Sequence, residues 1–278
     1  KNLSHVMRYI YFLSDQTGVT VETLGHSLIT QFDYHDFHQV TLPFIDSEDK
    51  AKEAVLRINS ENQNSEHKPI IFSTLVKEDL RLIVREIDGL ILDIFDVFIG
   101  PLEKELNQKS VRKTGLAHGM SDTKNYMKRI EATNFALSND DGGVIKHYDM
   151  ADIILTGVSR SGKTPTCLYL AMQYGVYAAN FPLTEYELED VVIPKSLKSF
   201  KEKLFGLTIA PERLRQIRKE RRSLGSYSSI KQISYEVRQA ERIFKKNNIK
   251  FIDTTELSIE EISGKILEKT GIERRFRQ

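Results

Sequence analysis

The sequence lacks several features that would place it outside the cell interior or in a membrane. Its 278 residues contain one cysteine, Cys167, which excludes an internal disulfide and favours a packed thiol in a reducing compartment. No apolar run approaches the ~20 residues that a membrane-spanning helix needs. The longest run, Leu90–Gly100, contains two aspartates. The N-terminus has no apolar core of a secretory signal peptide. We therefore expect a cytoplasmic protein with no membrane partner.

An excess of charge of one sign is also absent. The chain has 40 lysines and arginines against 39 aspartates and glutamates, so its overall charge gives no reason to expect a nucleic-acid or anionic-membrane partner. It has no zinc-ligand spacing and no basic stretch with interleaved aromatic residues, which further excludes the common nucleic-acid-binding modules. With 40% hydrophobic residues, the chain can bury a full core, and its length fits two ordinary domains.

The first hundred residues alternate short apolar runs with helical patterns of apolar residues. This alternation is typical of consecutive strands and helices, which build a mostly parallel sheet covered by helices. We expect residues 1–107 to form an N-terminal α/β domain. The expected strands lie at 9–13, 40–42 and 70–72, and the expected helices at 20–32, 48–61 and 77–87.

Residues 108–150 are richer in glycine and polar residues, with one helix expected at 124–137. We interpret this segment as a connection that can also carry site residues. Residues 151–278 then repeat the α/β pattern, so the expected fold class is α/β, with two units built on mostly parallel sheets. In the second unit we expect strands at 152–156, 177–180, 204–208 and 250–253, and helices at 166–174, 211–222, 229–247 and 258–270.

One segment of the second unit matches the phosphate-binding P-loop pattern and lies between an expected strand and an expected helix. In such a loop, glycine permits the positive φ that lets successive backbone N–H groups point at one anion. Lys163 would reach the outer phosphates, and the Thr164 hydroxyl would be a ligand of Mg²⁺. A surface loop that matches by chance is the alternative. We predict a P-loop nucleotide-binding, kinase-like domain with these phosphate-contacting residues: Gly157, Val158, Ser159, Arg160, Ser161, Gly162, Lys163 and Thr164.

A basic stretch follows in the same unit. Between Lys195 and Arg222, ten residues are basic and three are acidic. Arg218, Arg221 and Arg222 align at helical spacing, where arginines can bind phosphate oxygens through paired N–H groups. A solvated basic surface is an equally good explanation, although a kinase needs cations around the phosphoryl group that it transfers. We take Arg218 as a candidate catalytic residue.

Other candidates lie in loops. His118 and Asp141, in the connection, are placed where a base could reach an attacking hydroxyl, although turn chemistry alone explains the Asp140-Asp141-Gly142 run. Near the N-terminus, the Ser14–Gly18 segment follows a strand and precedes a helix, at the edge where open sheets bind ligands. There, Asp15 or Thr17 could simply cap the helix, which is the default role of such residues.

Two features of ordinary P-loop ATPases and GTPases are not evident. The second Mg²⁺-anchoring aspartate, which usually ends an apolar strand, is not evident. One expected strand ends at Asn180, and the aspartate at a strand end, Asp253, belongs to the last strand of the chain. An Asn-Lys-x-Asp run that would bind guanine is also absent from the sequence. Both observations argue against an ordinary ATPase or GTPase.

Motifs along almost the whole chain resemble one family, the bacterial and plant regulatory proteins of pyruvate, phosphate dikinase and of phosphoenolpyruvate synthase. The most specific are the extension of the P-loop segment by Pro165-Thr166 and the Lys203-Leu204-Phe205-Gly206-Leu207-Thr208 segment. The remaining matches are Ser14-Asp15-x-Thr17-Gly18, Thr41-Leu42-Pro43-Phe44, His118-Gly119, Asp140-Asp141-Gly142, Ala179-Asn180-Phe181-Pro182-Leu183 and Pro211-Glu212-Arg213-Leu214.

The resemblance implies a bifunctional serine/threonine kinase and phosphotransferase. Members use ADP to phosphorylate a threonine close to the catalytic phosphohistidine of the target, which inactivates it. They remove that phosphate with inorganic phosphate and release pyrophosphate. The residues of the motifs resemble the dikinase-type members more closely, so we expect pyruvate, phosphate dikinase as the first candidate target and phosphoenolpyruvate synthase as the second. ADP, inorganic phosphate and Mg²⁺ are the expected small-molecule partners.

Two other functions compete with this one. A P-loop, an arginine-rich helix and a final strand-helix pair also suit a small-molecule kinase, which a comparison of ATP and ADP as donors would distinguish. The absence of an evident Mg²⁺-anchoring aspartate suggests instead a nucleotide sensor without phosphoryl transfer. The sequence leaves the oligomeric state open, and a homodimer is compatible with it.

Overall fold

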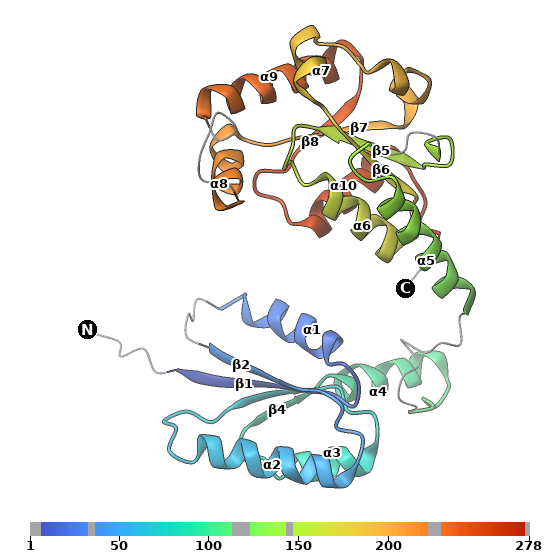
Figure 1. The fold of residues 1–278 in the computed structure, drawn as a ribbon. Helices are drawn as coiled ribbons and strands as arrows, with labels where there is room; N and C mark the ends of the chain where they lie inside the picture. Colours follow the sequence, from blue (N-terminus) through green and yellow to red (C-terminus); the bar gives the residue numbers. More distant parts are fainter. Residues whose placement is uncertain (1–6, 33–36, 113–122, 143–146, 222–228, 276–278) are drawn as a thin grey trace. The chain divides into compact units, whose positions relative to one another are not determined.

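The computed structural model describes residues 7–32, 37–112, 123–142, 147–221 and 229–275. The contacts within the chain divide it into two units, residues 1–119 and 120–278. Each unit contains one four-stranded parallel sheet with helices against it (Figure 1). The predicted α/β fold with two units is therefore confirmed, while the domain limits at 107 and 150 stay a prediction. In the described part of the chain, no helix is both long and apolar enough to cross a membrane.

The sheet of the N-terminal unit has the strand order β2-β1-β3-β4, with every neighbouring pair parallel. Parallel strands need crossover connections, and helices supply them here. The elements are β1 (Arg8–Leu13), α1 (Val19–Ile29), β2 (Phe37–Leu42), α2 (Glu48–Asn62), β3 (Ile70–Ser73), α3 (Glu78–Val84), β4 (Leu90–Asp93) and α4 (Ile94–Leu106).

Both faces of this sheet are covered, as a parallel sheet requires. Successive residues of β1 point to opposite faces, so Tyr11 and Leu13 pack with α2 and α3, whereas Ile10 and Phe12 pack with Val21 of α1. Figure 1 shows α1 on one side of the strands and α2 and α3 on the other. Ile94, at the start of α4, packs on the side of α1.

The sheet of the C-terminal unit has the equivalent order β6-β5-β7-β8, again all parallel. Its elements are α5 (Thr123–Ser138), β5 (Ile153–Gly157), α6 (Lys163–Tyr174), β6 (Ala178–Pro182), α7 (Glu185–Asp190), the 3₁₀ helix η2 (Lys195–Lys203), β7 (Leu204–Thr208), α8 (Pro211–Arg221), α9 (Ile230–Lys246), β8 (Lys250–Asp253) and α10 (Ile259–Thr270).

Two hydrophobic clusters, one on each face of the second sheet, form the core of this unit. Ile153, Leu155 and Phe205 belong to the cluster that includes residues of α5, α6 and α10, among them the buried Cys167. Ile154 belongs to the cluster that includes residues of α7, α8, α9 and η2. The unit is therefore a helix–sheet–helix sandwich, in which β5 lies in the middle of the sheet with neighbours on both sides.

The structure adds elements that the sequence patterns do not indicate. The sequence shows Leu90–Gly100 as one apolar run, but it divides into β4 and the start of α4, because Asp93 accepts hydrogen bonds from the N–H groups of Phe95 and Asp96 and caps the helix. The helices α7 and η2 are short and were not predicted. The helix expected at 166–174 begins at Lys163, inside the P-loop segment.

Both sheets change direction of winding at their first strand. The connection after β5 passes over the face that carries α6, and the connection after β6 passes over the face that carries α7. At such a switch point the loops separate and leave a crevice at the carboxyl ends of the strands, where open α/β sheets bind ligands. The segment Gly157–Thr164 leaves β5 at this edge.

Candidate functional site

The Gly157–Thr164 loop joins the end of β5 to the start of α6, the arrangement that its sequence predicts. Its turn depends on left-handed backbone at Arg160, with φ 73°, and at Gly162, with φ 94°, which is the N-cap of α6. The exposed N–H groups of a helix N-terminus carry partial positive charge and favour an anion. The loop therefore places the positive end of a 12-residue helix at the crevice.

Gly157 is required by the way the loop packs against the neighbouring strand. Its φ is 151°, and a Cβ at this position would lie 2.3 Å from the carbonyl oxygen of Leu207 in β7. Real Cβ atoms do not approach a backbone oxygen so closely, so a larger residue would separate β5 from β7 or deform the loop. The first glycine of the motif thus fixes the loop on the sheet.

Lys163 is buried, with 5% of its side chain exposed, and its Nζ donates a hydrogen bond of 2.9 Å to the carbonyl oxygen of Val158. Burial lowers the pKa of this ammonium group to about 8, an effect that the carboxylates of Asp141 and Asp140 oppose and the charge of Arg218 reinforces. The ammonium is held inside the curve of the loop, next to the place where the motif positions a phosphate.

Thr164 belongs to a polar cluster with Asp140 and Asn180. Its hydroxyl donates a hydrogen bond of 2.9 Å to Oδ1 of Asp140. The amide nitrogen of Asn180 contacts the same carboxylate oxygen and donates to the Thr164 hydroxyl at 3.0 Å. These three side chains come from the start of α6, the turn after α5 and strand β6, so the fold brings together residues that are distant in sequence.

Backbone hydrogen bonds hold the turn that carries Asp140. The N–H of Asn180 donates to the carbonyl of Asn139 at 3.2 Å, and the N–H of Gly142 donates to the carbonyl of Asn180 at 3.0 Å. The hydroxyl of Tyr148 donates to that same carbonyl at 3.0 Å. The turn is therefore attached to the middle residue of β6, and it presents Asp140 to Thr164 and the exposed Asp141, with φ 53°, to the cleft.

A cleft of about 350 Å³ lies over the loop. Cationic side chains and the helix N-terminus meet one carboxylate there, which suits a phosphate group whose transfer needs both positive charge and a proton acceptor. The lining residues are Asp141, Ser159, Arg160, Gly162, Lys163, Thr164, Pro165, Pro182 and Ile217.

Arg218 is 1% exposed, and its side chain contacts the Gly157–Thr164 loop rather than solvent. Its Nη2 donates to Oε2 of Glu236 in α9 at 2.7 Å and to the carbonyl oxygen of Ser159 at 3.1 Å. The expectation of a solvated basic surface is therefore wrong at this residue. Its catalytic role stays a prediction, and the structure adds that Arg218 connects α8, α9 and the loop.

Several predicted site residues receive no structural account. His118 and Arg222 lie outside the described residues, and the side chain of Arg221 is likewise not described. The predicted roles of the loop residues in nucleotide and Mg²⁺ binding stay predictions as well. Within the C-terminal unit, the fold brings Asp141, Arg160, Lys163 and Thr164 to one cleft.

The Ser14–Gly18 segment does not cap α1 through a side chain. Gly18, with φ 86°, is the N-cap and forms no side-chain cap hydrogen bond, so the capping role considered for Asp15 and Thr17 is wrong. Asp15 is instead buried, and its Oδ2 accepts a hydrogen bond of 3.2 Å from the N–H of Val76, which links the loops after β1 and β3. Burial raises the pKa of this carboxyl.

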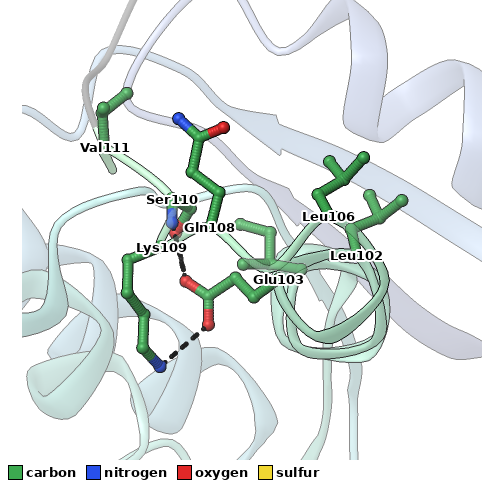
Figure 2. Close-up of a pocket in the computed structure, with 8 residues that line it drawn as sticks. Leu102, Glu103, Leu106, Gln108, Lys109, Ser110 and Val111 are labelled. Carbon is green, nitrogen blue, oxygen red and sulfur yellow. Dashed lines mark hydrogen bonds and ion pairs between the residues drawn. The ribbon is translucent and has the colours of Figure 1, made fainter.

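Another pocket, of about 320 Å³, lies at the end of α4 in the N-terminal unit (Figure 2). Leu102 and Leu106 project from one side, and Glu103 accepts hydrogen bonds from the N–H and hydroxyl of Ser110 and pairs with Lys109. These hydrogen bonds and the ion pair hold the pKa of Glu103 at about 2. The lining is mainly apolar and its carboxylate is already paired, so this pocket offers less chemistry than the cleft over the loop.

Asp140 is the site residue that sequence reasoning missed. It appears in the Asp-Asp-Gly turn, but its neighbour Asp141 was chosen as the candidate. Nothing local distinguishes the two aspartates, because the contact with Thr164 spans 24 positions and depends on α5 packing beside α6. The available signal was the lack of an aspartate at Asn180, which was expected to end its strand, although β6 continues to Pro182.

Comparison with known proteins places this arrangement in a family. The family model described as kinase/pyrophosphorylase matches residues 10–267. Relatives from Stutzerimonas stutzeri and Hahella chejuensis are 51% and 50% identical over 270 residues, covering 97% of this chain and 99% of theirs. One from Alcanivorax borkumensis is 51% identical with the same coverage. Each of these relatives is named as a phosphoenolpyruvate synthase regulatory protein, a role that its name gives as a proposal. The resemblance noted from the motifs is confirmed: the chain belongs to the kinase/pyrophosphorylase family.

Proposed function

We propose that the protein is a bifunctional regulator of phosphoenolpyruvate synthase. It transfers the β-phosphoryl group of ADP to a threonine of that enzyme, and it removes the group with inorganic phosphate to give pyrophosphate. The observation that carries the proposal is the cleft over the Gly157–Thr164 loop, where Lys163, the N-terminus of α6 and Asp141 surround a space of about 350 Å³. The family description, kinase/pyrophosphorylase, supports both directions of the chemistry.

In the forward direction, the threonine oxygen attacks the β-phosphorus of ADP, and the bond to the bridging oxygen breaks, so that AMP leaves. The proton of the threonine hydroxyl passes to a base, and we assign this role to Asp141, which lines the cleft. The ammonium of Lys163 and the loop N–H groups stabilise the charge on the transferring group. Mg²⁺, when bound beside Thr164, would neutralise further charge on the phosphates.

In the other direction, an oxygen of inorganic phosphate attacks the phosphothreonine phosphorus. The bond to the threonine oxygen breaks, pyrophosphate forms, and the threonine oxygen takes up a proton. ADP and pyrophosphate both present a diphosphate, so one cradle of loop N–H groups can hold both. Positioning and charge stabilisation dominate such in-line transfers, and both directions would use the same residues.

The names of the relatives favour phosphoenolpyruvate synthase over pyruvate, phosphate dikinase, the target that the motifs alone ranked first. The two enzymes are alternative substrates for the same chemistry at the cleft. The test therefore includes both.

The experiment supplies each target enzyme with phosphoenolpyruvate, which phosphorylates its catalytic histidine, and with ADP labelled in its β-phosphate. We expect label on a threonine of phosphoenolpyruvate synthase, located by peptide mapping. The variant Lys163→Ala should transfer no label, whereas Lys245→Ala, which removes an exposed lysine of α9, should behave as the wild type. Adding phosphate to the labelled enzyme should release labelled pyrophosphate.

Each other outcome has a definite meaning. Label on the dikinase alone would reassign the target, and transfer to small molecules from ATP would support a metabolite kinase instead. Nucleotide binding without any transfer would support a sensor. If Lys163→Ala abolished one direction and left the other intact, the shared cradle would be refuted.

A further inference from the structure

We infer that Asp140 and Asn180, together with Thr164, form the cation-binding side of the cleft, with Asp140 supplying the carboxylate that P-loop enzymes usually carry at a strand end. The inference rests on the proposed function, because the cation is the divalent ion that accompanies a nucleoside diphosphate. It assigns to Asp140 and Asn180 a role that neither the motif nor the sequence patterns give them.

The first support is the position of Asp140 relative to Thr164. In the P-loop motif the threonine hydroxyl is the protein's own ligand to the magnesium ion. That hydroxyl lies 2.9 Å from Oδ1 of Asp140, so a cation bound to Thr164 would meet this carboxylate at once. Carboxylate, hydroxyl and amide oxygens are the hard ligands that magnesium prefers, with phosphate oxygens and water completing its shell.

Asn180 provides an independent observation. The residue is fully buried, and its amide nitrogen is used by Asp140 and Thr164, but its amide oxygen has no hydrogen-bond partner within the described part of the chain. A buried amide oxygen without a partner costs free energy comparable to a lost hydrogen bond. In the present orientation the nitrogen, not the oxygen, faces Asp140 and Thr164. A half-turn about the Cβ–Cγ bond would exchange the two atoms, so that the oxygen could bind a cation there while the nitrogen gave up its two contacts.

The charges support the same assignment. Asn180 is the third of the five residues of β6, the strand beside the loop-bearing β5, and an aspartate at this position would face the threonine directly. The neutral amide leaves that position without charge, and Asp140, from the turn after α5, restores one negative charge at the same point. The described residues contain no group of three or more histidine, cysteine, aspartate or glutamate side chains that could hold a metal, so a site here must rely on phosphate oxygens as partners.

A purely structural role for the cluster is the competing explanation, in which Asp140 only receives hydrogen bonds that fix the turn. The two roles predict different responses to exchange of the carboxylate and the amide. The double variant Asp140→Asn/Asn180→Asp keeps one carboxylate and one amide at the site but moves the charge from the turn to β6. A cation site should tolerate this exchange, because the ion needs one carboxylate beside Thr164 from either position.

The test uses Mn²⁺ as the probe, measured by electron paramagnetic resonance with the full-length protein and ADP. ADP binding is measured separately by calorimetry in EDTA. We expect Asp140→Asn to weaken Mn²⁺ binding in the presence of ADP by about 10–100-fold. ADP binding in EDTA should stay within about threefold of the wild type. The double variant should recover most of the Mn²⁺ affinity. Asp149→Asn, which removes the same charge from an exposed residue before β5, is the matched control.

The outcomes separate this inference from the proposed function. Full Mn²⁺ affinity in Asp140→Asn would overturn the inference, as would a double variant that binds the ion no better than the single variant. A wild-type protein that binds no ADP, either in EDTA or with Mn²⁺ present, would instead refute the proposed function at its first step. Should Asp140→Asn fold poorly, as shown by its thermal melt, Asp140→Glu provides the second test. This variant keeps the negative charge, so it should still bind Mn²⁺, although its longer side chain displaces the turn.

Discussion

Replacing Arg218 by methionine should destabilise the C-terminal unit and weaken nucleotide binding together. The guanidinium is 1% exposed, and it pairs with Glu236, which is 17% exposed, at 2.7 Å. Methionine would leave that carboxylate in a buried place without its cation, a change that costs about 3–5 kcal/mol. We expect about 3 kcal/mol, the lower end, because Glu236 retains some contact with water and with the amide of Gln232.

A loss of this size should be visible in thermal unfolding. For a domain of this length, about 3 kcal/mol corresponds to a fall of roughly 6–12 °C in the melting temperature. We expect ADP to shift the transition of the C-terminal unit upward, since a ligand stabilises the unit to which it binds, and this is the transition to follow by circular dichroism. Arg215→Met, which removes an exposed arginine from the same helix, is the matched control and should leave the transition unchanged.

Two further measurements separate the ion pair from the loop contact. The double variant Arg218→Met/Glu236→Leu should be more stable than the sum of the single changes by at least about 1 kcal/mol, because the second change removes the unpaired carboxylate. ADP affinity should stay low in both variants, since the hydrogen bond to the carbonyl of Ser159 is missing in each. Additive stabilities, or a melting temperature for Arg218→Met equal to that of the control, would refute the reasoning.

The remaining predictions address the loop, its lysine and the core. Gly157→Ala should lower the free energy of unfolding by about 2–6 kcal/mol, because of backbone strain and the overlap of its Cβ with the carbonyl of Leu207. ADP should no longer stabilise this variant in a thermal melt. Burial lowers the pKa of Lys163 from 10.5 to about 8, so between these pH values the unfolded chain binds more protons than the folded one. The free energy of unfolding should therefore rise with pH in this range. In urea titrations the rise should reach up to about 3 kcal/mol relative to Lys163→Met. Forward transfer that depends on the charged ammonium should fall as pH rises above about 8, and a profile that is flat to pH 10 would contradict this role. Cys167 is buried and its pKa is raised, so a thiol reagent should label it at the rate of unfolding, whereas fast labelling of the native protein would show that the core opens. Gly264→Ala in α10 should stabilise the unit by about 0.5–1 kcal/mol in the same titrations, because a Cβ there meets no atom within 4 Å; a loss of stability would contradict the packing of this helix.

Local sequence patterns predicted the parts of the fold that depend on local physics. The strands at 204–208 and 250–253 have the predicted limits, and α10 begins within one residue of its predicted start, at a capping box in which Ser258 and Glu261 exchange hydrogen bonds. Each of these features depends on fewer than a dozen adjacent residues. Apolar runs and caps are recognisable before any long-range contact is known.

Features that depend on packing between distant segments were not predictable in this way. Asp140 differs from Asp141 only because the turn is attached to β6, and Arg218 is buried only because Glu236 of another helix lies opposite. The six-residue α7 and the 3₁₀ helix η2 were not predicted, and the apolar run Leu90–Gly100 hides the boundary between β4 and α4. The motif and its place between a strand and a helix were therefore recognisable from the sequence, but the residues that support the loop were not.

The assignment of strands to sheets has a consequence for the order in which the chain folds. The first sheet is built from β1 to β4, all within the first 93 residues, and the second from β5 to β8, which begin at residue 153. Purely parallel sheets require every crossover to close before neighbouring strands can pair, so each is slow to form and exposes apolar edges meanwhile. During synthesis, however, domains fold as units beginning from the N-terminus. The first sheet can be complete before the ribosome has made the second, so the two sets of similar strands need not compete for each other's edges.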